Sequence, residues 1–474
     1  MNTSFYHPIY NRAWQISALL LLTACVLLQA QQSKLPNIII VYADDLGYGD
    51  LSCFGAKDIA TPNIDRLAQE GIQFTDFYSA SSICSPSRAA LMTGRIPQRM
   101  GIHAVFFPES FTGMPTDEIT IADLLKRRGY ATAHVGKWHL GHHYQYLPLQ
   151  RGFDEYYGIP YSNDMESVVY MKNNVVDSFH IDQHYTTKTY TDEATDFIAR
   201  NKEQPFFLYL AHSMPHVPIY ASPKFEGRSE RGLYGDVIQE IDWSMGEILK
   251  QLAAENLLDN TLIIFSSDNG PWLVMEDHGG SAGHLREGKQ FTFDGGMRVP
   301  TLAMWKAKIP AGQVYSDLAV MMDWFPTIAG IVGAEIPSDR AYDGEDIRPV
   351  LFGTTKRKND QFLFFHTDGA YTLRGFRWGD WKVKLPYAGF KGTRGRKRVA
   401  PHDMLLFNLK EDPTESINLA QQYPDKLAAM LAEMEKARTR LGIFPPPLVI
   451  RTGSDKSHYD YLSAKRKRKN APPK

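Results

Sequence analysis

The sequence predicts an α/β fold in which a mixed, mostly parallel sheet lies between helices and is followed by a smaller C-terminal α+β domain with an antiparallel sheet. Two observations predict it. Strand-like runs rich in β-branched residues alternate with segments whose apolar residues recur every three or four positions, which is typical of β-α-β units. After about residue 355, short strand-like runs separated by Asp-Gly and Gly-Asp turns replace this alternation.

A chain of 474 residues is long enough to bury two cores. We expect the larger domain over residues 34–354 and the smaller one over 355–450, followed by a basic, disordered tail at 451–474. With 52 basic and 53 acidic residues, the formal charge of −1 gives no overall attraction to nucleic acid. We therefore expect no nucleic-acid partner, and any anionic ligand must be bound by a local cluster of cations.

The N-terminus has the pattern of an export signal. Arg12 is the only Lys or Arg in residues 1–30, which contain no acidic residue and carry an apolar run at 16–28. This predicts a periplasmic or extracellular protein whose mature chain begins near Gln31. The segment 22–25 also resembles a bacterial lipoprotein box, so the protein would be held at a membrane only if Cys25 were lipidated.

The first strand follows Pro36, because the run Asn-Ile-Ile-Ile-Val-Tyr-Ala at 37–43 has the composition of a strand buried on both faces. A helix at 61–71 has Thr61 as its cap and Pro62 at its first position. The alternation predicts further strands at 72–78, 130–135, 206–211 and 261–266, and further helices at 119–128, 192–200 and 237–252. In the smaller domain it predicts strands at 361–366, 371–374 and 381–385 and a helix at 424–438.

Another helix begins at the pentapeptide Cys-Ser-Pro-Ser-Arg, residues 84–88. Pro86 suits the first turn of this helix, and Gly94 ends it. Cys84 therefore lies at a helix N-terminus, where unpaired N–H groups stabilise an anionic oxygen or a thiolate and attract an anion. Arg88 lies one turn further on the same side. Taken alone, a single cysteine is more often a small buried hydrophobic residue.

Oxygen donors follow two of the predicted strands. Asp44 and Asp45 end the first strand, and Asp268 and Asn269 follow the strand at 261–266. Either pair alone suits a polar turn. Because ligand sites of parallel sheets lie off the carboxyl ends of the strands, the two pairs together favour a hard cation such as Ca²⁺, which binds carboxylate and amide oxygens.

Cationic and titratable side chains follow other strands. Lys137 and His139 occupy alternate positions in Gly-Lys-Trp-His-Leu-Gly, so they are expected to point the same way. His216 lies between two prolines just after the strand at 206–211, and Lys289 precedes an Asp-Gly-Gly turn that can bring it to the same site. The neighbouring His212 is expected to be a buried, hydrogen-bonded residue.

These motifs occur in the order found in one known family. The runs at 43–50, 84–88, 136–141, 158–162, 267–271 and 288–289 resemble the type I, formylglycine-dependent sulfatases, and in particular the branch of arylsulfatase A and N-acetylgalactosamine-6-sulfatase. The resemblance implies an alkaline-phosphatase-like fold and a Cys84 that a maturation enzyme converts to formylglycine. It implies a calcium ion held by Asp44, Asp45, Asp268, Asn269 and the modified Cys84. It also assigns sulfate-ester binding or processing to Arg88, Lys137, His139, Ser162, His216 and Lys289.

The implied reaction is hydrolysis of a sulfate ester, and export favours a sulfated polysaccharide or oligosaccharide as substrate. One hydroxyl of the hydrated formylglycine attacks sulfur with Asp268 as proton acceptor, His216 protonates the departing alcohol, and the second hydroxyl expels sulfate. His139 would help to deprotonate that second hydroxyl. Candidates for sugar contacts, which are equally well read as ordinary loop residues, are Asp164, His278, His284 and Arg286.

Cys53 and Cys84 are the cysteines that remain after export, so at most one disulfide is possible. Such a bridge would consume the formylglycine precursor, and we therefore expect no disulfide and a structural thiol at Cys53. Two other functions fit the same sequence. One is hydrolysis of phosphate or phosphonate esters by the same superfamily, and the other is noncatalytic binding of sulfated glycans by a chain whose Cys84 stays unmodified.

Overall fold

The computed structural model describes residues 35–165, 168–179, 181–365, 372–389, 400–442, 444–445 and 448. The predicted export signal at 1–30, with Cys25, and the predicted basic tail at 451–474 lie outside the described residues. The boundaries of the two predicted domains stay predictions, while the α/β fold with its second, antiparallel sheet is confirmed.

In the described part of the chain, ten strands form one mixed sheet in the order β11–β2–β10–β9–β1–β8–β4–β5–β6–β7. The five neighbouring strands β9, β1, β8, β4 and β5 are parallel to one another. On either side of them, β10 pairs antiparallel with β9 and β6 pairs antiparallel with β5. The bounds are β1 Asn37–Ala43, β2 Ile72–Phe74, β4 Ala131–Gly136, β5 Glu155–Gly158, β6 Tyr170–Lys172, β7 Val175–Ser178, β8 Phe206–Ala211, β9 Thr261–Ser267, β10 Thr301–Met304 and β11 Gln313–Tyr315.

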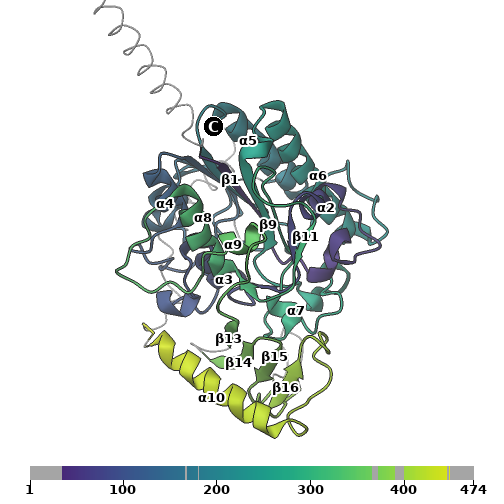
Figure 1. The fold of residues 1–474 in the computed structure, drawn as a ribbon. Coiled ribbons are helices and arrows are strands. Elements are labelled where there is room, and N and C mark those ends of the chain that lie inside the picture. The colour runs from purple at the N-terminus through teal and green to yellow at the C-terminus, as the bar shows by residue number, and fades with distance from the viewer. Residues whose placement is uncertain are drawn as a thin grey trace, which may run out of the picture. The chain divides into compact units, whose positions relative to one another are not determined.

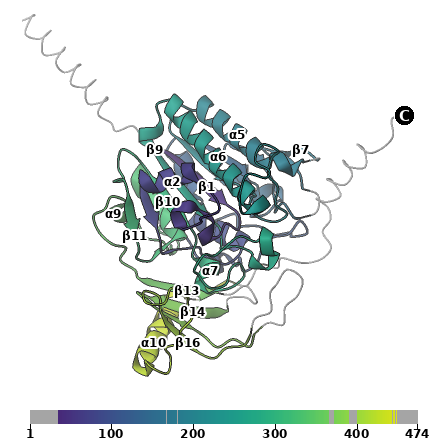
Figure 2. The same cartoon turned by 90° about the vertical axis from the view of Figure 1, so that its right-hand side faces the viewer.

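Helices cover both faces of this sheet (Figure 1). On one face, Ile39 and Val41 of β1 share a core with α2 (Pro62–Gln69), α5 (Thr186–Arg200) and α6 (Gly232–Ala254). On the other face lie α3 (Cys84–Thr93), α4 (Ile121–Arg127) and α8 (Trp324–Val332), which pack against one another. Both views show α5 and α6 side by side on their face (Figure 2). Burial on both faces explains why β1 has no polar residue after Asn37.

The predicted strand at 72–78 is wrong as a single strand. The chain leaves the large sheet after β2, and β3 (Phe77–Tyr78) pairs instead with β12 (Ala319–Val320) in a separate two-stranded sheet. Asp76 stands at the break, where its carboxylate forms ion pairs with Arg298 and Arg377. These two buried partners lie far away in the sequence, so local periodicity could not reveal the break.

The C-terminal antiparallel sheet has the order β13–β14–β15–β16, with bounds Gln361–Phe365, Leu373–Trp378, Trp381–Lys384 and Leu405–Asn408. Helix α10 (Pro424–Leu441) packs Met430 and Met434 against Phe376 and Val383 of this sheet. The helix predicted at 424–438 is therefore confirmed, whereas β16 was not predicted. Two one-turn helices, α7 (Asp294–Met297) and α9 (Arg348–Leu351), complete the set of described α-helices.

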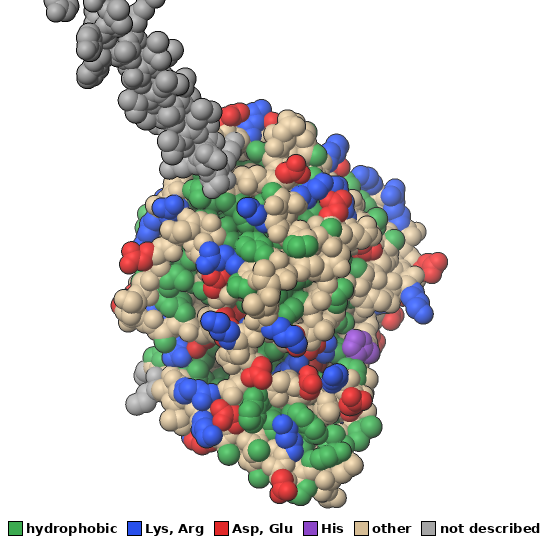
Figure 3. Space-filling view, viewed as in Figure 1, with side chains coloured by type: hydrophobic (Ala, Val, Ile, Leu, Met, Phe, Trp, Pro, Cys, Tyr) green, Lys and Arg blue, Asp and Glu red, His purple; other side chains and the backbone are tan. Residues whose placement is uncertain are grey.

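On the face drawn in Figure 3, Lys and Arg side chains are interspersed with Asp and Glu, which agrees with the near-zero net charge. None of the described helices has both the length and the apolar character that crossing a lipid bilayer requires.

Candidate active site

The candidate site lies where the central parallel strands end. Strands β9, β1, β8 and β4 are consecutive neighbours, and Ala43 of β1 is in register with Ser267 of β9. This register puts the carboxylates after β1 beside Asp268, and α3 brings Cys84 to the same edge. One ligand atom from each of four buried residues lies within 4.8 Å of the others, namely from Asp44, Asp45, Cys84 and Asp268.

The backbone turn at Asp44 and Asp45 directs the two adjacent side chains toward different partners. Asp45 has φ 66°, in the left-handed region that Asp tolerates better than most residues. Its N–H donates to Oδ1 of Asp268 at 3.1 Å, while the N–H of Asp44 donates to the carbonyl of Met214 at 3.2 Å. Each carboxylate therefore meets its own set of cations.

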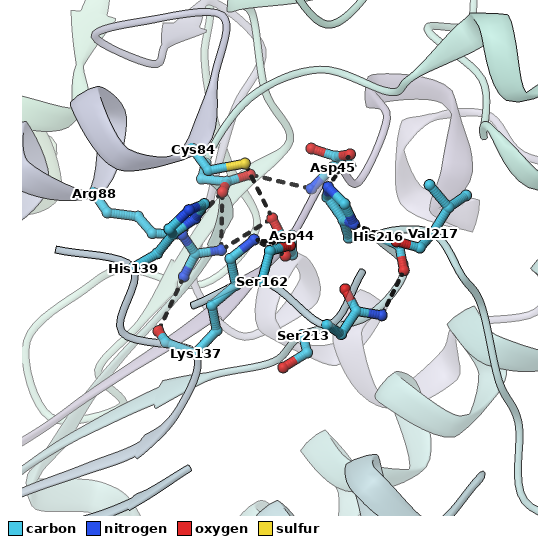
Figure 4. Close-up of polar contacts among 12 residues, drawn as sticks. Asp44, Asp45, Cys84, Arg88, Lys137, His139, Ser162, Ser213, His216 and Val217 are labelled. Atoms are coloured by element: carbon cyan, nitrogen blue, oxygen red, sulfur yellow. Dashed lines mark hydrogen bonds and ion pairs between the residues drawn. The ribbon is translucent and has the colours of Figure 1, made fainter. Parts of the chain in front are cut away.

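Arg88 and Lys137 bind Asp44 (Figure 4). Nη2 of Arg88 lies 3.2 Å from Oδ1 of Asp44 and 2.8 Å from Oδ2 of Asp268, and Nζ of Lys137 lies 2.5 Å from Oδ2 of Asp44. Burial acts to raise the pKa of Asp44, but Lys137 and Arg88 outweigh it and hold the pKa well below its usual value. Nζ of Lys137 also donates to Oγ of Ser162 at 3.0 Å.

Gly136 makes the position of Lys137 possible. It has φ 115°, and a Cβ at this residue would lie 1.8 Å from the carbonyl oxygen of Ala211 on the neighbouring strand. Only glycine fits this approach of β4 to β8, which lets the chain turn and direct Lys137 into the site.

Lys289 binds the second carboxylate, Asp45. Its Nζ lies 2.7 Å from Oδ2 of Asp45 and 3.6 Å from Sγ of Cys84. Burial acts to lower the pKa of Lys289, but Asp45 and Cys84 outweigh it and raise the pKa above its usual value. The ammonium group is therefore fixed as a cation beside the sulfur atom.

Cys84 is the first residue of α3 and is 2% exposed. Burial raises the pKa of its thiol well above the usual value, although Lys137 and Lys289 act to lower it. A buried neutral thiol is a poor nucleophile. The surroundings of residue 84 therefore suit a modified side chain better than a cysteine thiolate.

Two buried histidines adjoin the cluster. His216 has Nδ1 2.6 Å from the carbonyl of Val217, so Nδ1 is the donor and Nε2, 3.6 Å from Oδ2 of Asp45, faces the site. His139 has Nε2 2.8 Å from the carbonyl of Phe106, and its Nδ1 has no hydrogen-bond partner among the described residues. Burial lowers the pKa of both rings, so both are neutral near pH 7.

The donor set fits a hard divalent cation. Asp44, Asp45 and Asp268 offer carboxylate oxygens, and Oδ1 of the buried Asn269 has no hydrogen-bond partner among the described residues. A buried amide oxygen without a partner is costly unless a cation or another donor satisfies it. Burial raises the pKa of Asp268 to about 7, against the influence of Arg88.

Every residue predicted for catalysis, substrate binding or metal binding thus lies in one cluster. The candidates for sugar contacts are placed differently: Asp164 and His278 are exposed, and His284 stacks edge-on against Tyr48. Arg286 donates to the carbonyl of Glu415 at 2.6 Å and lies over the ring of Phe293, so its side chain is committed to packing against the C-terminal region. Both described cysteines, Cys53 and Cys84, are free thiols.

Two residues of the site were missed by the sequence analysis. The half-buried Trp272 lies 4.5 Å from Nζ of Lys289 and 5.6 Å from the ring of His216, measured to its ring centroid. Asn163 donates to the carbonyls of His216 and Pro218 and so fixes the loop that carries the histidine. Trp272 follows the predicted Asp-Asn-Gly-Pro motif directly, but nothing in its spacing indicates contact with two other loops.

The ion-paired cations Arg88, Lys137 and Lys289 near residue 84 suit a bound anion, and the histidines beside them can take up and release protons. These properties define an enzyme that hydrolyses anionic esters. The chain belongs to the sulfatase family, because residues 36–334 match the family model described as Sulfatase. It is a sulfuric ester hydrolase, as its sequence predicted.

Its relatives lie in the predicted branch. The chain is 38% identical to N-acetylgalactosamine-6-sulfatase of Canis lupus familiaris over 86% of this chain and 85% of the relative. It is 36% identical to arylsulfatase A of Homo sapiens over 89% and 91% of the two chains. A solved structure titled as Ps i-CgsB in complex with k-i-k-neocarrahexaose superposes with a TM-score of 0.75 at 30% identity, over 92% of this chain and 99% of the other.

Proposed function

We propose that this sulfatase cleaves sulfate esters of sulfated polysaccharides or oligosaccharides, with residue 84 as a formylglycine nucleophile. The observation that carries the proposal is the position of Cys84 at the start of α3, within 3.6 Å of both the Asp44 carboxylate and the Lys289 ammonium group. One relative is named N-acetylgalactosamine-6-sulfatase, and a similar solved structure is a complex with k-i-k-neocarrahexaose. Both support a sugar substrate for this chain.

The proposed cofactor is Ca²⁺, held by Asp44, Asp45, Asp268, Asn269 and the modified side chain of residue 84. When bound, it would supply positive charge that stabilises the sulfuryl oxygens and the attacking oxygen. Three carboxylates in the cluster balance the three cations Arg88, Lys137 and Lys289. A divalent cation would leave this cluster with excess positive charge, which matches an anionic ester.

The hydrated formylglycine would supply two hydroxyl groups, one to attack sulfur and one to expel sulfate afterwards. The chain's own cations hold the ester for this attack. The charges of Lys137 and Lys289 both act on residue 84, and Ser162 lies beside Lys137 as a further donor to a sulfate oxygen. Their positions are fixed by ion pairs, so they need not reorganise as charge develops on the oxygens.

Proton transfers would fall to titratable groups of the cluster. Asp268, which lies in the same cluster as residue 84, would accept the proton of the attacking hydroxyl. His216 presents Nε2 to the site, but in the neutral ring the proton lies on Nδ1. Nε2 would therefore first take up a proton from solvent and then pass it to the leaving alcohol. His139, with Nδ1 free of hydrogen bonds to described residues, would accept a proton from the second hydroxyl.

We also propose that the protein is exported and matured by a formylglycine-generating enzyme. The N-terminal pattern at 1–30 supports export, and the pentapeptide at 84–88 supports maturation. Intact-mass spectrometry of the exported chain would distinguish cleavage near Gln31 from a lipidated Cys25, because the acyl chains and the six additional residues raise the mass.

The proposal is tested by turnover of 4-nitrophenyl sulfate and 4-nitrophenyl phosphate by the protein purified from its native host. We expect clear preference for the sulfate, no turnover by Cys84→Ala, and loss of activity when the metal is removed by a strong chelator. Preference for phosphate would support the phosphoester hydrolase instead. An active metal-free protein would contradict the calcium site.

A further inference from the structure

A cavity of ≈ 270 Å³ opens between α5, α6 and the loop after His216. Its wall includes Tyr185 and Lys188 at the start of α5, Lys224 in the loop, and Glu240 and Trp243 on α6. None of these residues belongs to the cluster around Cys84.

The cavity and the active site face the same edge of the large sheet. Helix α5 ends at Arg200 and leads into the beginning of β8, whereas α6 starts after β8 has ended and leads into β9. Because β8 and β9 are parallel, the first turns of both helices lie near the carboxyl ends of the strands, where Cys84 also lies. Tyr185 and Lys188 adjoin the first turn of α5, whereas Glu240 and Trp243 lie further along α6.

A chain of contacts connects the two places. Asn163 donates to the carbonyl of His216 at 3.2 Å and to Oε1 of Gln183 at 3.3 Å. The next residue, His184, packs edge-on against Tyr220, with 4.9 Å between the ring centroids. Tyr220 is two residues before Ser222, which lines the cavity. These buried and half-buried contacts thus connect the loop that carries His216 to the wall of the cavity.

The cavity combines aromatic surface with positive charge. Tyr185 is 45% exposed, and Trp243 is half-buried. Nζ of the exposed Lys224 lies 4.8 Å from the ring centroid of Trp243, and Lys188 is exposed and paired with Asp192. Aromatic faces pack against the apolar face of a sugar ring, and lysine ammonium groups bind sulfate oxygens.

Glu240 supplies a buried acceptor in the same cavity. It is 1% exposed, and its Oε2 accepts the N–H of Ser222 at 2.8 Å. Its Oε1 has no hydrogen-bond partner among the described residues. A buried carboxylate oxygen without a donor is costly, and a sugar hydroxyl entering the cavity would satisfy it.

We propose that this cavity is an outer carbohydrate subsite, which holds a sulfated sugar residue of the polymer at a distance from the ester being cleaved. The inference rests on the proposed function, because it assigns a second contact to the same sulfated glycan. An apolar peptide segment would offer no donor to Oε1 of Glu240 and no anionic group to the exposed Lys224, so the sulfated sugar is the occupant that the chemistry favours.

The subsite is tested by calorimetric binding of two hexasaccharides, chondroitin 6-sulfate and neocarrahexaose, to the full chain carrying Cys84→Ala, which prevents turnover. We expect at least one hexasaccharide to bind. Adding Trp243→Ala or Lys224→Ala should weaken that binding about fivefold to tenfold, as the loss of one aromatic or cationic contact does. Lys250→Ala, an exposed lysine elsewhere on α6, should change nothing.

Turnover of 4-nitrophenyl sulfate by Trp243→Ala and Lys224→Ala with Cys84 intact separates the subsite from the catalytic site. We expect wild-type rates, because this substrate is too small to reach the cavity. Unchanged hexasaccharide affinity in both variants, no hexasaccharide binding at all, or a parallel loss of nitrophenyl sulfate turnover would overturn the subsite. A wild type that leaves nitrophenyl sulfate intact would instead contradict the proposed catalytic function.

Discussion

Asp44 and Asp45 show how much of this site depends on single residues. They are adjacent in the sequence, yet Asp44 pairs with Arg88 and Lys137 while Asp45 pairs with Lys289. Residue types, their positions beside predicted strands, helices and turns, and the resemblance to type I sulfatases together predicted all of these side chains. Their pairing was not predictable, because it depends on the backbone turn at Asp45. The position of Trp272, which packs on Lys289 from another loop, was not predictable either.

Replacing Lys289 by methionine tests the cation beside residue 84. Lys289→Met keeps most of the apolar side chain but leaves Asp45 without its 2.7 Å ion pair and removes one of the three cations that would bind the sulfate ester. We expect kcat for 4-nitrophenyl sulfate to fall by about a hundredfold or more. Lys250→Met, at an exposed lysine, should keep wild-type kcat. A Lys289→Met enzyme of normal activity would remove Lys289 from the mechanism.

We expect the buried His212 to make the folded protein less stable in acid. Burial lowers its pKa to about 4, so between about pH 6.5 and pH 4 the unfolded chain binds a proton that the folded chain does not. The free energy of unfolding should therefore fall with falling pH, by about 2 kcal/mol from this residue between pH 7.5 and pH 5.

Urea unfolding of His212→Gln at both pH values measures this contribution, since glutamine can keep a contact with Ser244, which lies 3.4 Å from Nε2 of His212. The variant should lose part of the acid sensitivity, while His278→Gln, at an exposed histidine, should lose none. An identical pH dependence in His212→Gln and the wild type would refute the assignment.

Elements are held in register by side chains that cross between them. Helix α2 has no side-chain cap of its own at Thr61, and Asp242 of α6 accepts the N–H groups of Asn63 and Ile64 at 2.9 and 2.8 Å instead. The helix itself was predictable from Pro62 and its apolar spacing. Its cap was not, because the capping residue lies 179 positions away from Asn63.

Removing this cap tests the contact between α2 and α6. Asp242→Ala should lower the free energy of unfolding by about 1–2 kcal/mol, because two N–H groups at the helix start lose their acceptor. Asp259→Ala, at an exposed aspartate, is the matched control and should be neutral. The midpoints of urea unfolding of the two variants measure this difference. Equal midpoints would mean that Asp242 does not cap α2.

The fold as a whole joins two sheets through buried charges. Lys382 of β15 lies 2.6 Å from Oδ1 of Asp294 in α7 and 2.8 Å from Oε1 of Glu415, and all three residues are fully buried. The alternation of strands and helices predicted the large sheet because its core is local and periodic. Some short strands escaped prediction because their pairing partners, rather than their own sequences, define them, namely β5, β6, β7, β10, β11, β12 and β16.

Breaking the network at Lys382 should loosen the C-terminal sheet from the larger one. Lys382→Met leaves Asp294 and Glu415 buried without their cation, which should lower the free energy of unfolding by about 3–5 kcal/mol. Lys410→Met, at an exposed lysine, should have no effect. Differential scanning calorimetry measures the stability of both variants. A Lys382→Met protein as stable as the wild type would show that the ion pairs of Lys382 with Asp294 and Glu415 do not hold the sheets together.

Mass spectrometry of the peptide that contains residue 84 tests the central claim most directly, provided that the same natively expressed sample is shown to hydrolyse sulfate esters. We predict the mass of formylglycine in place of cysteine, in a fraction of molecules that rises with specific activity. A fully active sample in which every molecule carries an unmodified thiol would contradict the claim.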